Sequence, residues 1–223
     1  VMGLRGSSTL RRLTASLLLA LSLALAGLTP SAKAHPHAWI DLKSTLIFDE
    51  DGQIVAVEMY WLFDDFYTAF VLEDIEYATD GKAAALIELA GANLENLAEY
   101  GYFADFQADG ERVTYGPVET YDSGMEGERL WMSFVVPLSR PVDPREERVT
   151  FAVYDPTYYI EILYVAEGEK LRLSPEDTGC TAQIQPPNPD PEVVAFAASL
   201  GPEESGGDSL GLLFAETVTV ECP

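Results

Sequence analysis

Hydrophobic and polar residues alternate along AWIDLKSTLIF (38–48), with Ile40 on one face of an extended chain and Asp41 on the other. An alternation with a period of two residues is typical of a β-strand that is buried on one face. The acidic turn DEDG (49–52) follows, and QIVAVEMYWLF (53–63) has the composition of a second strand. The pattern therefore predicts a β-hairpin at this point in the chain.

Helical patterns follow the hairpin. Asp64 stands where a side chain can cap a helix, and the apolar spacing after it predicts a helix through about Ile75. Residues 82–105 have a second, longer helical pattern, which Gly91 is expected to break. We therefore expect helices inserted directly after the first hairpin.

The second half of the chain returns to β-strand patterns. Strand-like runs separated by Gly, Pro and Asp are found at residues 112–120, 129–138, 147–155, 158–165 and 212–222. The proline-rich segment 185–191 cannot continue a central strand, and a short helix is expected at 192–200. The sequence predicts an α+β fold, with a mostly antiparallel, sandwich-like β-sheet domain and helices inserted after the first hairpin. The length agrees with a single domain over residues 35–223.

Residues 1–34 have the three-part layout of a secretory signal peptide. Arginines form a basic head, an apolar run covers residues 15–28, and the tripeptide AKA (32–34) has the small-x-small form that signal peptidase cleaves. A retained N-terminal anchor is the alternative, but the run is shorter than the roughly 20 residues that span a bilayer. We expect cleavage after Ala34 and a mature domain, residues 35–223, in the periplasm.

The chain is strongly acidic, with 37 Asp and Glu residues against 13 Lys and Arg residues and a formal net charge of −24. Nucleic acid is excluded as a partner, because phosphate binding requires a basic surface. An acidic surface instead favours solubility and attracts cations, and adaptation to a salty habitat would also explain it. No apolar stretch after the expected cleavage site is long enough to span a bilayer. We therefore expect the mature protein not to be embedded in the membrane.

Cys180 and Cys222 are the only cysteines. In an oxidising compartment, such a pair most often forms a disulfide, which here would tie the C-terminal strand to the segment near residue 180. A thiolate metal site is the alternative, although the two residues lack the C-x-x-C spacing that zinc sites favour.

The sequence HPH at residues 35–37 contains the only two histidines in the chain. After cleavage at Ala34, His35 would offer an α-amine and an imidazole to a metal ion, and His37 would add a third nitrogen. These donors suit the divalent ions of zinc, nickel, cobalt and copper. Pro36 excludes the square-planar amino-terminal copper motif, because proline has no backbone N–H to lose.

Carboxylates from distant segments are expected to complete this metal site. Asp64 in WLFDD and Asp155 in VYDPTYY are the predicted ligands, and each has a structural alternative as a helix cap or a turn residue. The sequence lacks H-E-x-x-H, C-x-x-C and a glycine-rich phosphate loop. We therefore predict that the protein is not an enzyme. A copper enzyme that uses the N-terminal histidines is the catalytic alternative.

Aromatic residues suggest a second type of site, lined by Trp39, Tyr60, Trp61, Phe63, Phe66, Tyr154, Tyr158, Tyr159 and Tyr164. Aromatic residues on strands more often form core and cross-strand pairs. The alternative to a metal carrier is therefore a periplasmic solute-binding protein that holds a small organic ligand in an aromatic-lined pocket. A structural role in the cell envelope is a further alternative.

Four segments, HPHAWID, WLFDDFYTAF, VYDPTYYIEI and LGLLFAETVTVEC, occur in this order over nearly the whole expected mature chain. Together they resemble bacterial periplasmic proteins described as periplasmic components of ABC-type transport systems, often paired with nickel/cobalt-type or zinc transporters. The family's HPH start falls on His35 and His37, its tryptophan–aspartate element on Trp61 and Asp64, and its tyrosine–aspartate–proline element around Asp155. The resemblance implies a periplasmic accessory protein that passes zinc, nickel or cobalt to an inner-membrane transporter.

Overall fold

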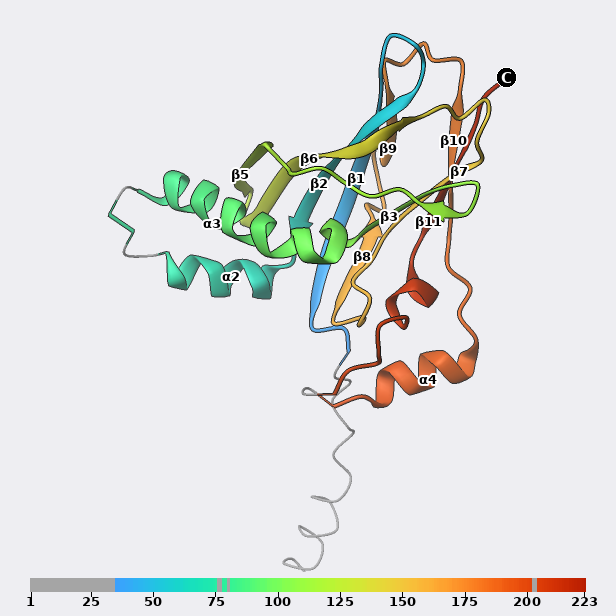
Figure 1. Ribbon diagram of the computed structural model, residues 1–223. Coiled ribbons are helices and arrows are strands. Elements are labelled where there is room, and N and C mark those ends of the chain that lie inside the picture. The colour runs from blue at the N-terminus through green and yellow to red at the C-terminus, as the bar shows by residue number, and fades with distance from the viewer. Residues whose placement is uncertain (1–34, 76–77, 80, 202–203) are drawn as a thin grey trace, which may run out of the picture. The chain divides into compact units, whose positions relative to one another are not determined.

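The computed structural model describes residues 35–75, 78–79, 81–201 and 204–223 (Figure 1). The expected signal peptide, residues 1–34, lies outside the described residues. Among the helices that the structure describes, none is both long enough and apolar enough to cross a membrane.

The described strands form two sheets. The first has the strand order β5-β6-β2-β1-β8, and β9 also pairs with β1. Its strands are β1 (Ala38–Phe48), β2 (Ile54–Phe63), β5 (Thr120–Glu126), β6 (Arg129–Val142), β8 (Ile160–Tyr164) and β9 (Leu171–Ser174). The second has the order β10-β11-β7-β3-β4, formed by β3 (Ala104–Ala108), β4 (Glu111–Arg112), β7 (Val149–Val153), β10 (Thr181–Gln185) and β11 (Thr217–Glu221). The pairs are antiparallel except that β1 runs parallel to β8 and β9.

Both sheets contribute to one hydrophobic core. Trp61 and Phe134 of the first sheet and Phe106 and Phe151 of the second are all at most 2% exposed. Successive side chains of a strand point to opposite faces, so the alternating pattern of the sequence places one face of each sheet in this core. The mostly antiparallel, sandwich-like α+β fold predicted from the sequence is confirmed.

The described helices are α2 (Asp65–Asp74), α3 (Lys82–Leu97) and α4 (Pro191–Ser199), with the short 3-10 helices η1 (Ala98–Phe103) and η2 (Gly211–Phe214). α2 and α3 follow the first hairpin, as predicted, and Figure 1 shows them at the β5 side of the first sheet. α3 buries Leu86, Ala90 and Leu94, which share one stripe of the helix, and this helix packs against β5.

The predicted break at Gly91 is wrong, and the helical structure that begins at Lys82 ends at Phe103, two residues before the predicted end at 105. α3 runs through Gly91, and this glycine allows the helix to approach β5 closely. An added Cβ would lie 2.6 Å from the hydroxyl oxygen of Tyr121 in that strand. α3 itself ends at Leu97, and residues 104–108 form β3. The glycine therefore serves packing between elements rather than the end of a helix.

The predicted strand at residues 112–120 is also wrong over most of its length. Within the described chain, Arg112 ends the two-residue strand β4, and Tyr115 makes an isolated bridge with Leu138. Pro117 cannot donate a hydrogen bond to a neighbouring strand, and β5 begins only at Thr120. The sequence pattern also failed to predict the short strands β9 and β10.

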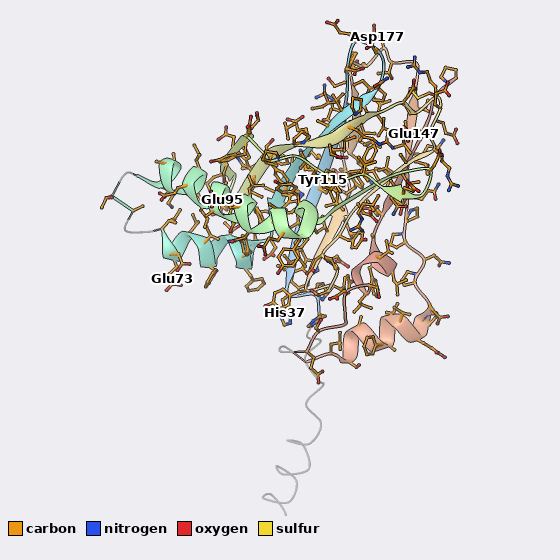
Figure 2. All side chains as sticks on the ribbon, in the orientation of Figure 1. His37, Glu73, Glu95, Tyr115, Glu147 and Asp177 are labelled. Carbon is orange, nitrogen blue, oxygen red and sulfur yellow. A yellow bond between two sulfur atoms is a disulfide. The ribbon has the colours of Figure 1, made fainter. Side chains whose placement is uncertain are left out.

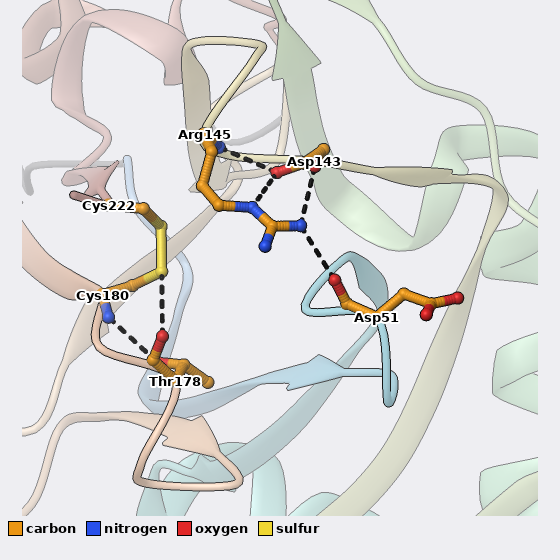
Figure 3. The surroundings of a disulfide bond; sticks show 6 residues. All are labelled: Asp51, Asp143, Arg145, Thr178, Cys180 and Cys222. Atoms are coloured by element: carbon orange, nitrogen blue, oxygen red, sulfur yellow. Dashed lines mark hydrogen bonds and ion pairs between the residues drawn. A yellow bond between two sulfur atoms is a disulfide. The ribbon is translucent and has the colours of Figure 1, made fainter.

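Cys180 and Cys222 form a disulfide, which confirms the predicted pairing (Figure 3). The bond lies directly beside the pairing of Thr181 in β10 with Glu221 in β11. It therefore links the last strand of the chain covalently to its neighbour at the edge of the second sheet.

Candidate functional site

Three segments that are far apart in the sequence meet at the beginning of β1. The backbone N–H of His37 donates a hydrogen bond to the carbonyl oxygen of Tyr159 at 2.8 Å. The backbone N–H of Trp39 donates to Oδ2 of Asp64, also at 2.8 Å. Figure 2 shows His37 at this end of the strand. The HPHAWID, WLFDD and YDPTYY segments are thus parts of one site.

The two histidines form a compact pair at this site. Their ring centroids are 4.9 Å apart, and the ring of His37 stacks on Tyr159 with a centroid distance of 4.5 Å. His35 is only 6% exposed. Nδ1 of His35 and Nε2 of His37 are buried and make no hydrogen bond with any described residue. Each imidazole therefore has one nitrogen that no hydrogen bond with the described residues occupies.

The spacing of the two rings agrees with the binding of one ion by both. A zinc ion lies about 2.0–2.1 Å from a bound imidazole nitrogen, and so about 3.2 Å from the centre of the ring. Two rings with centres 4.9 Å apart would subtend an angle of roughly 100° at such an ion, which is close to the tetrahedral angle. The pair is spaced for neighbouring positions in one coordination sphere.

Asp64, one of the two predicted carboxylate ligands, connects helix α2 to β1. Its Oδ1 accepts hydrogen bonds from the backbone N–H groups of Phe66 at 2.7 Å and Tyr67 at 3.0 Å, which caps the helix. Its Oδ2 accepts the bond from Trp39, two residues after His37. The carboxylate therefore fixes the start of β1, and its role as a metal ligand stays a prediction.

Asp155, the other predicted carboxylate ligand, is 5% exposed and organises the loop that leads to β8. Its Oδ1 accepts hydrogen bonds from the N–H and the hydroxyl of Thr157, both at 2.9 Å, and its Oδ2 accepts from the N–H of Ile160 at 3.0 Å. This loop carries Tyr159 against His37. Across the described parts of the chain, no group of three or more His, Cys, Asp or Glu side chains is placed to hold a metal.

The fourth segment of the resemblance, LGLLFAETV, supports the same loop from the other side. The N–H of Gly211 donates to the carbonyl oxygen of Pro156 at 3.0 Å. Phe214 stacks on Tyr158 with a centroid distance of 4.1 Å. All four segments that carry the resemblance thus contribute to the start of β1 or to the loop beside it.

The nine aromatic candidates do not form one pocket. Trp61, Phe63 and Tyr159 line a cavity of about 260 Å³ beside the histidine pair. The remaining six lie outside its walls: Trp39, Tyr60, Phe66, Tyr154, Tyr158 and Tyr164. Sequence reasoning missed Asn93 and Phe103, which also line this cavity. Both come from the segment that was expected to be one broken helix, so no periodic signal could place them there.

Two tyrosines, the buried Tyr164 and the partly buried Tyr67, give the fold a dependence on alkaline pH. Burial raises the pKa of Tyr67 and of Tyr164, whose hydroxyl lies 2.8 Å from the Ser44 hydroxyl. A group whose pKa is raised by folding stabilises the fold below its ordinary pKa, about 10 for tyrosine, and this stabilisation is lost as the pH rises through the folded value. We expect the melting temperature to fall above about pH 10. The ultraviolet absorbance of tyrosinate should show these two groups ionising only as the protein unfolds, and their ionisation in the folded protein near pH 10 would contradict the prediction.

The fold and the site define a two-sheet α+β domain with a histidine pair at the start of its first strand, in which His35 is buried and His37 is half-buried. A family model described as "Protein of unknown function (DUF1007)" matches residues 20–222, and the chain belongs to this family. A relative from Haemophilus influenzae, described as an uncharacterized protein, is 30% identical over 192 residues, which cover 85% of this chain and 91% of the relative. Metal binding, periplasmic location and a link to transport stay predictions.

Proposed function

We propose that the protein is a periplasmic accessory protein that holds one divalent transition-metal ion through His35 and His37 and passes it to an inner-membrane transporter. Zinc, nickel and cobalt are the candidate ions, with copper as a further candidate. The observation that carries this proposal is the pair of imidazoles 4.9 Å apart, each with one buried nitrogen that bonds to no described residue.

A bound metal would satisfy both nitrogens at once. A buried polar atom without a partner costs about 1–3 kcal/mol, and a bound metal would remove this cost for both nitrogens. The stacking of His37 on Tyr159 uses the face of the ring and leaves the Nε2 lone pair, which lies in the ring plane, available to an ion. The site is thus oriented by its neighbours for metal binding.

The Nδ1 atom of His35, which bonds to no described residue, is the ring nitrogen that suits the expected cleavage after Ala34. Cleavage would give His35 a free α-amine, and Nδ1 is the ring nitrogen nearer to the backbone. Nδ1 can therefore bind the same ion as the amine of its own residue in a small chelate ring, which Nε2 is too distant to form. Together with Nε2 of His37, this set would supply three of the nitrogen donors that borderline metals prefer.

The transport part of the proposal is supported by the resemblance and by charge. The four segments resemble periplasmic components of transport systems, and they converge on the histidine pair. A chain with a formal net charge of −24 raises the local concentration of cations at its surface. Both features favour a carrier that collects metal ions for a membrane partner.

Calorimetric titration of the untagged protein beginning at His35 tests this function. We expect one equivalent of metal to bind, and the His35→Ala/His37→Ala double variant to bind it at least about 100-fold more weakly. The chain has no other histidine, so this variant removes every imidazole. Equal affinity in the wild type and the variant would contradict the proposal.

Three further variants separate the donors. A protein that retains Ala34 lacks the α-amine of His35 and should bind more weakly than the mature form. Asp64→Asn and Asp155→Asn should lower the melting temperature and leave the affinity for metal unchanged if these carboxylates only anchor the backbone. If either is a ligand, its variant should instead lose affinity, as the histidine variants do.

A further inference from the structure

The cavity beside the histidine pair has uncharged walls. It has a volume of about 260 Å³ and lies between β1 and β2 of the first sheet and the helices α2 and α3. Five of its twelve lining residues are aromatic: Trp61, Phe63, Tyr67, Phe103 and Tyr159. None of the twelve is charged, although the chain as a whole has a net charge of −24. Such walls favour an uncharged, planar ligand of one or two rings.

Polar groups at the cavity are few. Nε1 of Trp61 is buried and makes no hydrogen bond with any described residue, and the side chain is 2% exposed. Trp61 lines the cavity, and because an indole N–H can only donate, an acceptor on a bound molecule could satisfy it. Asn93 and Asn96 of α3 add amide groups to the wall. Apolar walls with a few polar groups are typical of small-molecule sites.

The backbone has positive φ at Phe103, which lines the cavity, and at Tyr158, next to the lining residue Tyr159. Phe103 has φ 57° and Tyr158, directly before Tyr159, has φ 60°. This left-handed region is unfavourable for residues other than glycine, and such strain tends to be concentrated at functional sites. The rings of Trp61 and Phe103 stack with an interplanar angle of 18°. The fold thus accepts strain at positions that place Phe103 and Tyr159 at the cavity.

We infer that this cavity is a binding site for a small, uncharged aromatic molecule that carries one hydrogen-bond acceptor, which receives the Trp61 indole N–H. The site is separate from the proposed metal centre but shares Tyr159 with it, since this ring lines the cavity and also stacks on His37. The inference does not depend on metal binding.

Two probes of nearly the same shape test the inference. 1-Indanone has a carbonyl acceptor and indane lacks it. In chelator-treated protein, nitrogen–proton correlation spectra should show the Trp61 indole resonance shifting on addition of 1-indanone. Calorimetry should show 1-indanone binding about tenfold more tightly than indane, as expected for one buried hydrogen bond.

Substitutions inside the cavity show where the probe binds, and a substitution outside it is the control. Trp61→Phe keeps the aromatic wall and should reduce 1-indanone to the affinity of indane, whereas Trp39→Phe, outside the cavity, should change nothing. Leu97→Trp should fill the space and abolish binding of both probes. Binding should persist in the His35→Ala/His37→Ala variant, which separates this site from the metal centre. The inference is overturned if neither probe binds, or if Leu97→Trp binds both as the wild type does.

Discussion

Replacing Gly211 with alanine is expected to lower the free energy of unfolding by about 3 kcal/mol or more. Gly211 is buried at the start of η2. A Cβ there would overlap the carbonyl oxygen of Asp155 and lie 2.9 Å from its carbonyl carbon. Both atoms belong to the backbone, so no side-chain rotation can relieve the clash. Chemical denaturation monitored by tryptophan fluorescence measures the loss.

The same substitution should also disturb the histidine pair. The loop that begins at Asp155 carries Tyr159, so its displacement should weaken the proposed metal binding as well as the fold. Gly201→Ala is the matched control, because the nearest atom to its added Cβ, 3.4 Å away, is Oε2 at the end of the flexible Glu204 side chain. A Gly211→Ala protein as stable as this control would contradict the described contact.

Removal of the disulfide is expected to lower the free energy of unfolding by about 4 kcal/mol. Cys180 and Cys222 are separated by 42 positions, and the bond restricts the unfolded chain by closing this loop. The Cys180→Ser/Cys222→Ser variant should therefore unfold at a lower denaturant concentration than the wild type. Equilibrium denaturation of both proteins under non-reducing conditions measures the difference.

Reduction of the wild type provides the control for this prediction. In the presence of dithiothreitol, the wild type should unfold at the same denaturant concentration as the double serine variant. If the variant matches the oxidised wild type instead, the disulfide does not stabilise the fold. The proposed metal binding should be retained in the folded variant, since the bond joins β10 to β11 and not the segments around His37.

The sequence was most informative where one physical signal acted alone. Alternation along 38–48 predicted the bounds of β1, because burial of one sheet face requires a period of two. Asp64 predicted the start of α2, since a short acceptor side chain is favoured before the first turn of a helix. The cysteine count predicted the disulfide. Each of these rests on local chemistry or on a simple count.

Sequence-based prediction was incomplete where contacts between segments add to or override the local preference of a residue. Gly91 has the local preference of a helix break, yet it lies inside α3, where the hydroxyl of Tyr121 from β5 packs close to it. The metal-ligand role of Asp155 stays a prediction, but the sequence did not show that its carboxylate also accepts three hydrogen bonds from its own loop. These contacts depend on spatial neighbours, which the periodicity of the sequence does not reveal.

The sequence by itself determined the α+β class, the first hairpin with its following helices, the cysteine pair and the histidines as the candidate donors. Only the tertiary structure decided that β1 pairs in parallel with β8 and that this pairing brings Tyr159 to His37. It likewise decided that Phe103 stacks on Trp61 beside the cavity. The physical reason is that periodicity and capping act over a few residues, whereas contacts between distant segments arise only when the two sheets and the helices pack together.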